Sequence, residues 1–279
     1  MKLELGSRTQ RQLEQIRWQP SGSYLFFGPI GTGKYSAARA LADQTVADPR
    51  NVLVVENEKL SLGIDLIHNL NYQLQLKATR GHRYAIIRSA EKMTTEAQNA
   101  FLKTLEEPPL DTTIILTASD RTKLLPTIIS RCQLVGFEPI AQPRVEDYLS
   151  RKHGLNKQQS AQLAELTDGA LGRAINLASD EEARQRWLAT EQAVEVLGDP
   201  ARDSYQKLQA VARAGIEPRL LIERLITRLR QQIKAAADNR ELLANLHPKL
   251  SQVEASWRYL AANVNPKLVL AQLSLEMAA

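Results

Sequence analysis

The sequence has little of what characterises membrane-spanning, secreted or disulfide-stabilised proteins. Its 279 residues contain a single cysteine, Cys132, so no disulfide can form within the chain, and a reducing cytoplasm suits this composition. No apolar run approaches the ~20 residues that a membrane-spanning helix requires. The start of the sequence also lacks the apolar core of a signal peptide. We therefore expect a cytoplasmic protein without a membrane anchor.

Metal-binding and serine-hydrolase patterns are missing too. The four histidines are His68, His82, His153 and His247, and they lack the spacing of metal ligands. No Gly-x-Ser-x-Gly nucleophile elbow accompanies them. We therefore expect no metal site.

The charge balance is basic but diffuse. A net charge of +5 and a pI near 9.3 are compatible with a nucleic-acid neighbourhood. The basic residues are nevertheless scattered rather than gathered in one block. A local cluster of Arg80, His82 and Arg83 is most simply a solvated turn.

The spacing of apolar runs predicts three domains. Five short runs alternate with helical stretches between residues 8 and 136, at 24–27, 52–55, 84–87, 114–117 and 134–137. This alternation is typical of a parallel sheet covered by helices, so we expect an α/β domain over residues 1–137. Short helices broken by Gly154 and Gly169 predict a small helical lid over residues 138–182. Residues 183–279 read as an all-α domain of amphipathic helices.

The helices of this last domain are expected to break at 198–200, at 215–218 and at His247-Pro248. One of them has an apolar face at helical spacing, formed by Ile222, Leu225, Ile226, Leu229 and Ile233. Its basic residues Arg224, Arg228, Arg230 and Lys234 are expected to lie off this face.

A phosphate-binding loop follows the first of these runs, with one departure from the pattern. Gly28, Gly33 and Lys34 occupy the places where glycines turn backbone N–H groups toward phosphate and a lysine neutralises it. Tyr35 stands where a Ser or Thr hydroxyl would ligate Mg²⁺. Its phenol cannot reach that position, and Ser36 lies about 100° further round the helix. Magnesium would therefore lose its ligand in the loop.

The acidic half of a nucleotide site is also altered. A hydrophobic strand should end in one acid that anchors Mg²⁺ and a second that polarises the attacking water. The run at 84–87 is followed instead by Arg88 and Ser89. A rival run at 52–55 precedes Glu56 and Glu58, but it lies one helix after the loop, which fits the next strand of a βαβ unit better. The sequence predicts a degenerate ATPase site.

Four motifs, followed by a C-terminal segment, carry a resemblance. They are Gly-Pro-Ile-Gly-Thr-Gly-Lys at 28–34, Ala-Gln-Asn-Ala-Phe-Leu-Lys-Thr-Leu-Glu-Glu-Pro-Pro at 97–109, Leu-Leu-Pro-Thr-Ile-Ile-Ser-Arg-Cys at 124–132, Gly-Arg-Ala at 172–174, and Asn-Val-Asn-Pro-Lys-Leu at 263–268. Their order resembles that of bacterial clamp-loader AAA+ subunits, and most of all the delta-prime family of the DNA polymerase III clamp loader. Motor subunits of that assembly keep the hydroxyl and the acids, so their absence here favours delta-prime. Many delta-prime proteins carry a four-cysteine zinc module, which this chain lacks.

The resemblance implies roles for individual residues. It makes Arg131 an arginine finger that reaches a neighbour's ATP, where an arbitrary arginine would be a surface residue. It places Arg173 at the family's second sensor, although a structural role facing the lid is an equal alternative. Ser119 takes the first-sensor position, or is an ordinary strand-end serine. The Glu-Glu-Pro-Pro run at 106–109 most simply ends a helix.

The loop residues form the degenerate nucleotide site implied by the same resemblance. They are Gly28, Gly31, Gly33, Lys34 and Tyr35. Lys34 either holds an anion or lies in a solvated loop. We expect no cofactor to be required, and whether ATP or ADP binds is left open.

Two functions follow from this reading. The first is a non-hydrolysing clamp-loader subunit, a component of the DNA polymerase III holoenzyme that is no enzyme by itself. Its partners would be the ATPase motor subunits and the clamp-opening subunit, and indirectly the sliding clamp and primed DNA. The alternative is an active AAA+ ATPase, either a motor subunit or a helicase-type remodeller, with unusual metal ligation. For such an active site, the sequence offers only Glu91 and Asp120 as acids that could ligate Mg²⁺ or position water, and both lie outside the expected positions.

Overall fold

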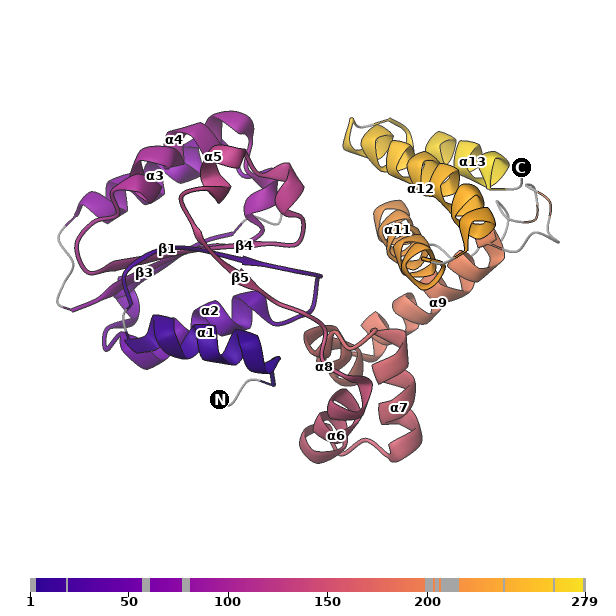
Figure 1. Cartoon of the computed structure of the whole chain (residues 1–279), viewed down its shortest axis with the longest axis horizontal. Coiled ribbons are helices and arrows are strands. Elements are labelled where there is room, and N and C mark those ends of the chain that lie inside the picture. The colour runs from indigo at the N-terminus through magenta and orange to yellow at the C-terminus, as the bar shows by residue number, and fades with distance from the viewer. Residues whose placement is uncertain are drawn as a thin grey trace. The chain divides into compact units, whose positions relative to one another are not determined.

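A computed structural model of the chain describes residues 4–18, 20–56, 61–76, 81–198, 203, 206, 216–237, 239–262 and 264–277. The chain forms two compact units, Met1–Ser179 and Asp180–Ala279, and Figure 1 labels their elements. The predicted domain boundaries at residues 137 and 182 stay predictions. Glu58, Arg80, Asn263 and parts of the two predicted helix breaks at 198–200 and 215–218 lie outside the described residues.

The first unit is built on a five-stranded parallel sheet. Its strands are β1 (Gly22–Phe27), β2 (Val52–Val55), β3 (Arg83–Ile87), β4 (Thr112–Ala118) and β5 (Gln133–Gly136). Their order is β2-β3-β4-β1-β5. Every pairing is parallel, with Phe27 opposite Ala118 of β4 and Gly136 of β5. The predicted α/β sheet is confirmed, and β1 lies between the later strands β4 and β5.

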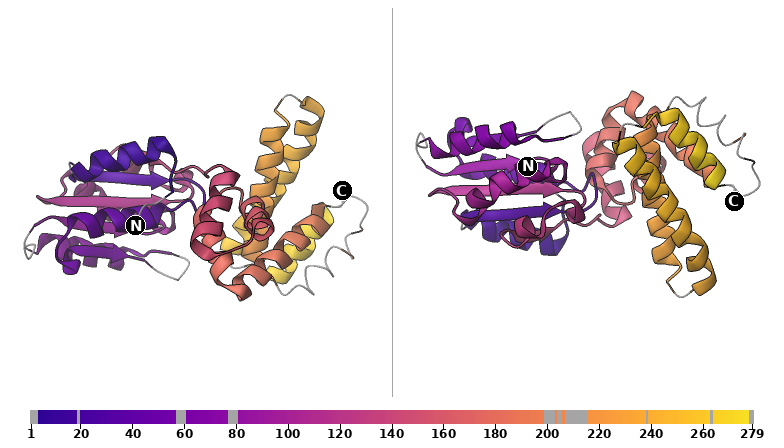
Figure 2. Two further views of the ribbon diagram at one scale, coloured as in Figure 1. Left: turned by 90° about the horizontal axis from the view of Figure 1, so that it is seen from below. Right: turned by 90° about the horizontal axis from the view of Figure 1, so that it is seen from above.

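Helices cover both faces of this sheet (Figures 1 and 2). One face carries α1 (Ser7–Trp18) and α2 (Lys34–Thr45), and the other carries α3 (Ile64–Gln75), α4 (Thr95–Glu106) and α5 (Pro126–Ile129). Three short 3-10 helices complete the connections, at η1 (Pro49–Asn51), η2 (Ala90–Lys92) and η3 (Arg121–Lys123). Each face therefore has its own apolar core against the sheet.

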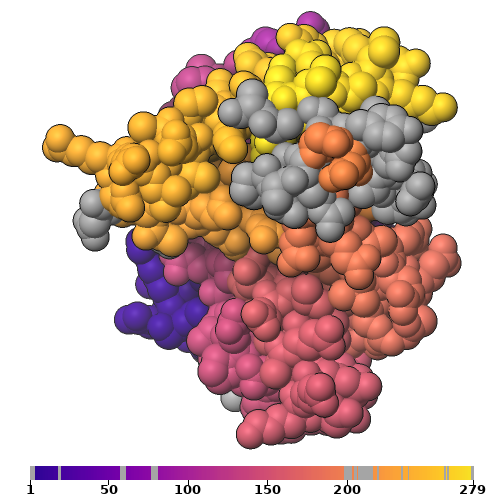
Figure 3. All heavy atoms as spheres, turned by 90° about the vertical axis from the view of Figure 1, so that its right-hand side faces the viewer, coloured from indigo at the N-terminus to yellow at the C-terminus, as the bar shows by residue number. Residues whose placement is uncertain are grey.

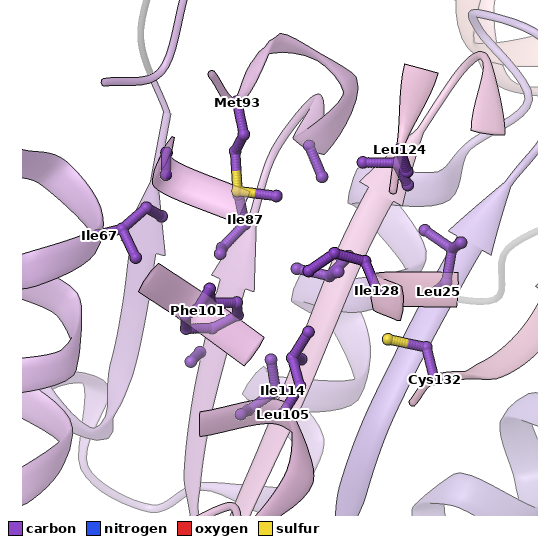
Figure 4. Packing of buried hydrophobic residues seen from close by; sticks show 14 of the residues in the cluster. Leu25, Ile67, Ile87, Met93, Phe101, Leu105, Ile114, Leu124, Ile128 and Cys132 are labelled. Atoms are coloured by element: carbon purple, nitrogen blue, oxygen red, sulfur yellow. The ribbon is translucent and has the colours of Figure 1, made fainter. Parts of the chain in front are cut away.

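The core under α3, α4 and α5 is continuous and fully apolar at its centre. Phe101 of α4 is completely buried among Ile67, Ile87 and Ile114, as Figure 4 shows. α4 begins where the Thr94 hydroxyl accepts the N–H of Ala97 at 3.2 Å, and it ends at Glu106 before two prolines, which cannot continue a helix.

The side chains of His82 and Arg83 are engaged in the fold, which differs from the predicted solvated turn. Arg83 is only 7% exposed and donates to the carbonyls of Gln73 and Leu74, at 2.9 and 3.2 Å, at the end of α3. His82 bonds to the Thr113 hydroxyl at 2.7 Å. Arg83 thus supplies donors to the last carbonyls of α3, which have no partner within the helix. His82 contacts β4 instead.

The lid follows the sheet within the same unit. It consists of α6 (Gln142–His153), α7 (Lys157–Leu166) and α8 (Leu171–Ser179). Gly154 ends α6 in the left-handed conformation, and Asn156 with Gln159 forms a capping box at the start of α7. Gly169 has φ 77°, and a Cβ there would lie 2.1 Å from the Ile140 carbonyl oxygen. The predicted breaks at Gly154 and Gly169 are thus backbone positions that favour glycine.

The second unit is helical, with a core of its own. Its described helices are α9 (Glu181–Gly198), α11 (Pro218–Ala235), α12 (Arg240–Ala261) and α13 (Pro266–Glu276). Ile222, Leu225 and Leu229 of α11 are buried as predicted, and Ile226 and Ile233 pack against the same core. Figure 3 shows α13 (yellow) at the surface, where Leu268 and Leu275 are 65% and 63% exposed.

Two local predictions in this unit are wrong. Pro248 was expected to break the helix but lies inside α12, because burial of Leu246, Val253 and Leu260 outweighs one lost backbone hydrogen bond. Arg224 was placed off the apolar face, yet it is 8% exposed. Its guanidinium pairs with Glu191 and lies 4.9 Å from the ring centroid of Trp187, and these partners compensate for its burial.

Among the described residues, no helix combines the length and the apolarity that crossing a bilayer requires.

Because each unit has its own core, we expect a chain ended after residue 180 to fold alone. It should unfold cooperatively in urea, as followed by circular dichroism. Phe101→Ala in this shortened chain should lower the free energy of unfolding by about 3–5 kcal/mol, whereas Tyr72→Ala, at a 63% exposed position, should change it little. A shortened chain that lacks a cooperative transition while the full chain shows one would contradict the division.

Candidate degenerate nucleotide site

The predicted site residues converge at the carboxyl ends of the central strands. The loop 28–33 follows β1, η2 follows β3 and Ser119 follows β4. Since these strands are parallel and adjacent, their ends meet at one edge of the sheet. Such an edge is where open α/β sheets bind ligands. Lys34, Ser119 and Arg173 are brought together here, but their roles stay predictions.

The start of the loop is held tightly by the neighbouring strands. The N–H of Gly28 donates to Ala118 O at 3.2 Å, and the N–H of Phe137 donates to Phe27 O at 2.8 Å. A Cβ on Gly28, at φ 144°, would lie 2.0 Å from the Phe137 carbonyl oxygen. Only glycine fits at this point, and the role of Gly28 in a phosphate loop stays a prediction.

The lid touches the loop directly. The N–H of Gly172, in α8, donates to Gly31 O at 2.8 Å. Gly31 has φ 82°, and a Cβ there would lie 2.9 Å from the Cβ of Arg173. Arg173 therefore faces both the loop and the lid, and both of its predicted roles remain open.

Lys34 turns its charge toward its own loop. Its Nζ donates to the carbonyls of Gly28 and Pro29 at 2.5 and 2.6 Å. Burial lowers the pKa of Lys34 to about 8, an effect that Glu91 opposes and Arg173 reinforces. The ammonium is thus bonded inside the loop rather than standing free in solvent.

The two departures from the nucleotide-binding pattern lie against each other. The guanidinium carbon of Arg88, at the end of β3, is 5.0 Å from the ring centroid of Tyr35. Arg88 Nη1 also pairs with Glu56 Oε2 at 3.1 Å. Glu56 follows the edge strand β2, which pairs with β3, so this acid lies beside Arg88. A cation and an aromatic ring thus occupy the places of the two expected Mg²⁺ ligands, and they do not fit that ion.

Glu91 is closer to the site than its sequence position suggested. One carboxylate oxygen accepts the Ser119 N–H at 3.1 Å and also the Ser119 hydroxyl. The other, Oε2, is buried and has no hydrogen-bond partner in the described part of the chain. Glu91 also acts electrostatically on Lys34. Its position three residues beyond Arg88, in the η2 turn, is the only signal in the sequence that could have indicated this.

Asp120 does not take part in the same way. Its Oδ1 accepts the N–H and hydroxyl of Thr122, at 3.0 and 2.6 Å, and begins η3. Within the described ranges, no three His, Cys, Asp or Glu side chains gather as a metal site.

Arg131 lies apart from this edge of the sheet. It lies two residues before β5, and so stands near the amino ends of the strands, opposite to the phosphate loop. Its Nε donates to Glu106 Oε1 at 2.6 Å, and its Nη1 donates to Thr127 O at 3.0 Å. The neighbouring thiol of Cys132 is buried, which raises its pKa to about 12. Arg131 is therefore placed away from its own subunit's loop.

The environment of Lys34 predicts an unusual titration. We expect its side chain to lose its proton near pH 8, well below the pKa of a free lysine, because burial disfavours the charged ammonium. Glu91→Gln should lower this pKa further, because the carboxylate favours the charged ammonium. Nitrogen-detected NMR of the labelled lysines measures both values, and a Lys34 pKa near 10.5 would contradict the burial.

The same shift sets the sign of a stability effect. Between about pH 8 and about pH 10 the unfolded chain keeps a proton that folded Lys34 has lost, so the free energy of unfolding rises with pH. Lys34→Met should remove this part of the rise, which urea unfolding at both ends of the window would detect.

Comparison with known proteins places these features in a family context. A family model described as "DNA polymerase III, delta subunit" matches residues 47–141. DNA polymerase III subunit delta-prime of Bacillus subtilis is 32% identical over 183 residues, which cover 58% of this chain and 55% of the relative. The Escherichia coli delta-prime subunit is 30% identical over 162 residues, which cover 57% of this chain and 47% of the relative. Replication factor C subunit 3 of Saccharomyces cerevisiae is 30% identical and covers 55% and 48%.

The matches to these relatives are partial in length. The chain spans about half the length of these curated relatives. Among solved structures, a DNA polymerase III gamma subunit-related protein of Thermotoga maritima superposes with a TM-score of 0.57 at 21% identity, over 98% of this chain and 99% of that one. A RuvB variant of the same organism gives 0.51 at 14% identity, covering 81% and 79%. The fold is therefore that of AAA+ proteins, and the predicted resemblance to the delta-prime subunits of DNA polymerase III is confirmed.

Proposed function

We propose that this chain is a non-hydrolysing AAA+ subunit of a replicative clamp loader. It would join ATPase motor subunits and a clamp-opening subunit, and through them act on the sliding clamp and primed DNA. The similarity to delta-prime and replication factor C subunits supports this assembly. Its own contribution would be structural, together with Arg131 supplied to the ATP of an adjacent motor subunit.

The contact between Arg88 and Tyr35 carries the non-hydrolysing part of the proposal. A guanidinium stays charged at all relevant pH values, so it repels a divalent cation from the end of β3. The Tyr35 ring, 5.0 Å away, is an acceptable neighbour for this cation but no replacement for a serine or threonine oxygen. Restoring the loop hydroxyl alone would leave Arg88 in place. A working Mg²⁺ site would therefore require substitutions at both Tyr35 and Arg88.

The position of Arg131 supports action in trans. The phosphate loop stands at the carboxyl edge of the sheet and Arg131 near the amino edge, so the guanidinium is remote from its own loop. Its side chain is 31% exposed, which leaves it accessible to a neighbour. A subunit that cannot hydrolyse ATP can still use this arginine, because it acts on another subunit's nucleotide.

The helical second unit suits a collar that joins neighbouring subunits. It has its own core, so it does not depend on the sheet for its stability. On α13, Leu268 and Leu275 present apolar side chains to solvent on one helical face, since seven residues make nearly two turns. Contacts with other subunits would cover this face.

A second candidate function rests on Glu91. Its buried Oε2, without a hydrogen-bond partner among the described residues, and its influence on Lys34 are what an alternative acid in an active AAA+ ATPase would show. This function requires Mg²⁺-dependent ATP hydrolysis by the isolated chain that is lost in Glu91→Gln. The bond from Ser119 to Glu91 favours the non-hydrolysing function, because it already uses one carboxylate oxygen.

The arginine finger is tested by Arg131→Ala in the assembled clamp loader. A finger supplied in trans is worth about 10³–10⁵ in rate at its own site, or about 4–7 kcal/mol. The total ATPase rate should fall by less, because the other motor sites keep their own arginines. DNA-stimulated ATPase and clamp-loading rates of reconstituted assemblies measure the effect. Lys at this position should rescue little, since a point charge lacks the planar fork.

The matched control is Arg50→Ala. Arg50 is also a surface arginine in an ion pair, with Asp48 at 2.8 Å, but it lies before the edge strand β2. We expect this variant to behave as wild type. Unchanged rates for Arg131→Ala, at equal incorporation into the assembly, would leave the chain only a scaffold role.

A further inference from the structure

The guanidinium of Arg131 is held on two sides by its own chain. Glu106 Oε1 accepts from Nε at 2.6 Å and also from Nη2, while Thr127 O accepts from Nη1 at 3.0 Å. We propose that Glu106 is a positioning residue, which fixes the orientation in which Arg131 meets a phosphate of the adjacent subunit's nucleotide. This inference rests on the proposed role of Arg131 and adds a residue to it.

Both partners stand on rigid supports. Leu105 and Cys132, the chain neighbours of Glu106 and Arg131, are 3% and 8% exposed in one apolar core, with fully buried Ile128 between them in sequence. Figure 4 shows these three side chains in the packed cluster. The backbone at both ends of the ion pair is therefore fixed by packing, and the pair restricts what freedom the arginine side chain retains.

The charge of Glu106 points to a purpose other than stability. Glu106 is the last residue of α4, where the helix dipole is negative and a carboxylate is unfavourable. The side chains of Arg131 and Glu106 are 31% and 46% exposed, and ion pairs this exposed contribute little to folding. The main physical effect of the contact is to hold one rotamer of Arg131.

The pair leaves the arginine able to bind an outside acceptor. A guanidinium has five N–H groups, one on Nε and two on each Nη atom. Glu106 uses the Nε hydrogen and one on Nη2, while the Thr127 carbonyl and, at 3.4 Å, the Ser130 hydroxyl use the two on Nη1. A second hydrogen on Nη2 remains for a phosphate oxygen. Glu106 thus orients the group without consuming its capacity to donate.

The test compares Glu106→Ala and Glu106→Gln with Glu107→Gln in reconstituted clamp loaders. Glu107 is the matched control, because it is an exposed glutamate next in the chain that makes no ion pair within the described ranges. We expect Glu106→Ala to lower kcat of DNA-stimulated ATP hydrolysis by a factor at least about half as large as the factor by which Arg131→Ala lowers it. KM should stay unchanged. Glu106→Gln, which keeps an acceptor oxygen, should lose less, and Glu107→Gln nothing.

The double variant of Glu106→Ala and Arg131→Ala distinguishes a positioning role of Glu106 from a general structural effect. Adding Glu106→Ala to Arg131→Ala should cause no further loss, because Glu106 acts only through the arginine. An equal loss with and without Arg131 would overturn the inference, and so would a rate above wild type, which would make the pair a restraint on the finger. Should Glu106→Ala fail to enter the assembly, the isosteric Glu106→Gln carries the same comparison.

Failure of this inference is separable from failure of the proposed function. If Arg131→Ala lowers the rate and both Glu106 variants match wild type, the finger stands and the positioning role is wrong. If Arg131→Ala itself has no effect at equal incorporation, the finger proposal fails, and the role of Glu106 fails with it.

Discussion

The stacking of Arg88 on Tyr35 is the contact on which the account of this chain depends. An AAA+ site works by holding Mg²⁺ between a loop hydroxyl and an acid at the end of a neighbouring strand. Here the two positions carry an aromatic ring and a permanent cation, 5.0 Å apart, and Glu56 pairs with the cation from the edge strand. The substitutions are mutually compatible. Arg88 without Tyr35 would lose the aromatic face that its charge contacts, and Tyr35 without Arg88 would lose its cationic neighbour.

The remaining contacts of the first unit are consistent with the structural role proposed for it. Lys34 bonds to carbonyls of its own loop, and the lid helix α8 bonds to Gly31, so the loop is supported from within the subunit. The sheet still carries Arg131 near the opposite edge from this loop. Under the proposed function, this unit would present Arg131 to a neighbour without any change at its own site.

Much of this fold was predictable because local patterns determine it. The loop glycines require backbone conformations that other residues rarely adopt, and apolar runs of four or five residues mark the buried strands. Contacts between distant residues were not predictable in this way. The pairs Arg131 with Glu106 and Ser119 with Glu91 join residues 25 and 28 apart, and nothing in the one-dimensional pattern distinguishes these partners. Pro248 and Arg224 were misjudged because packing overrides local preference and buried partners accept a charge.

Calorimetric titration of the isolated chain with ATP, with and without Mg²⁺, tests the central claim most directly. If Arg88 and Tyr35 occupy the ligand positions, Mg²⁺ adds no binding energy. The Kd for ATP should then agree within about twofold with and without Mg²⁺, or binding should be undetectable in both conditions. Binding that becomes about tenfold tighter or more in the presence of Mg²⁺ would show that the chain holds the metal after all. The account of a degenerate site would then be wrong.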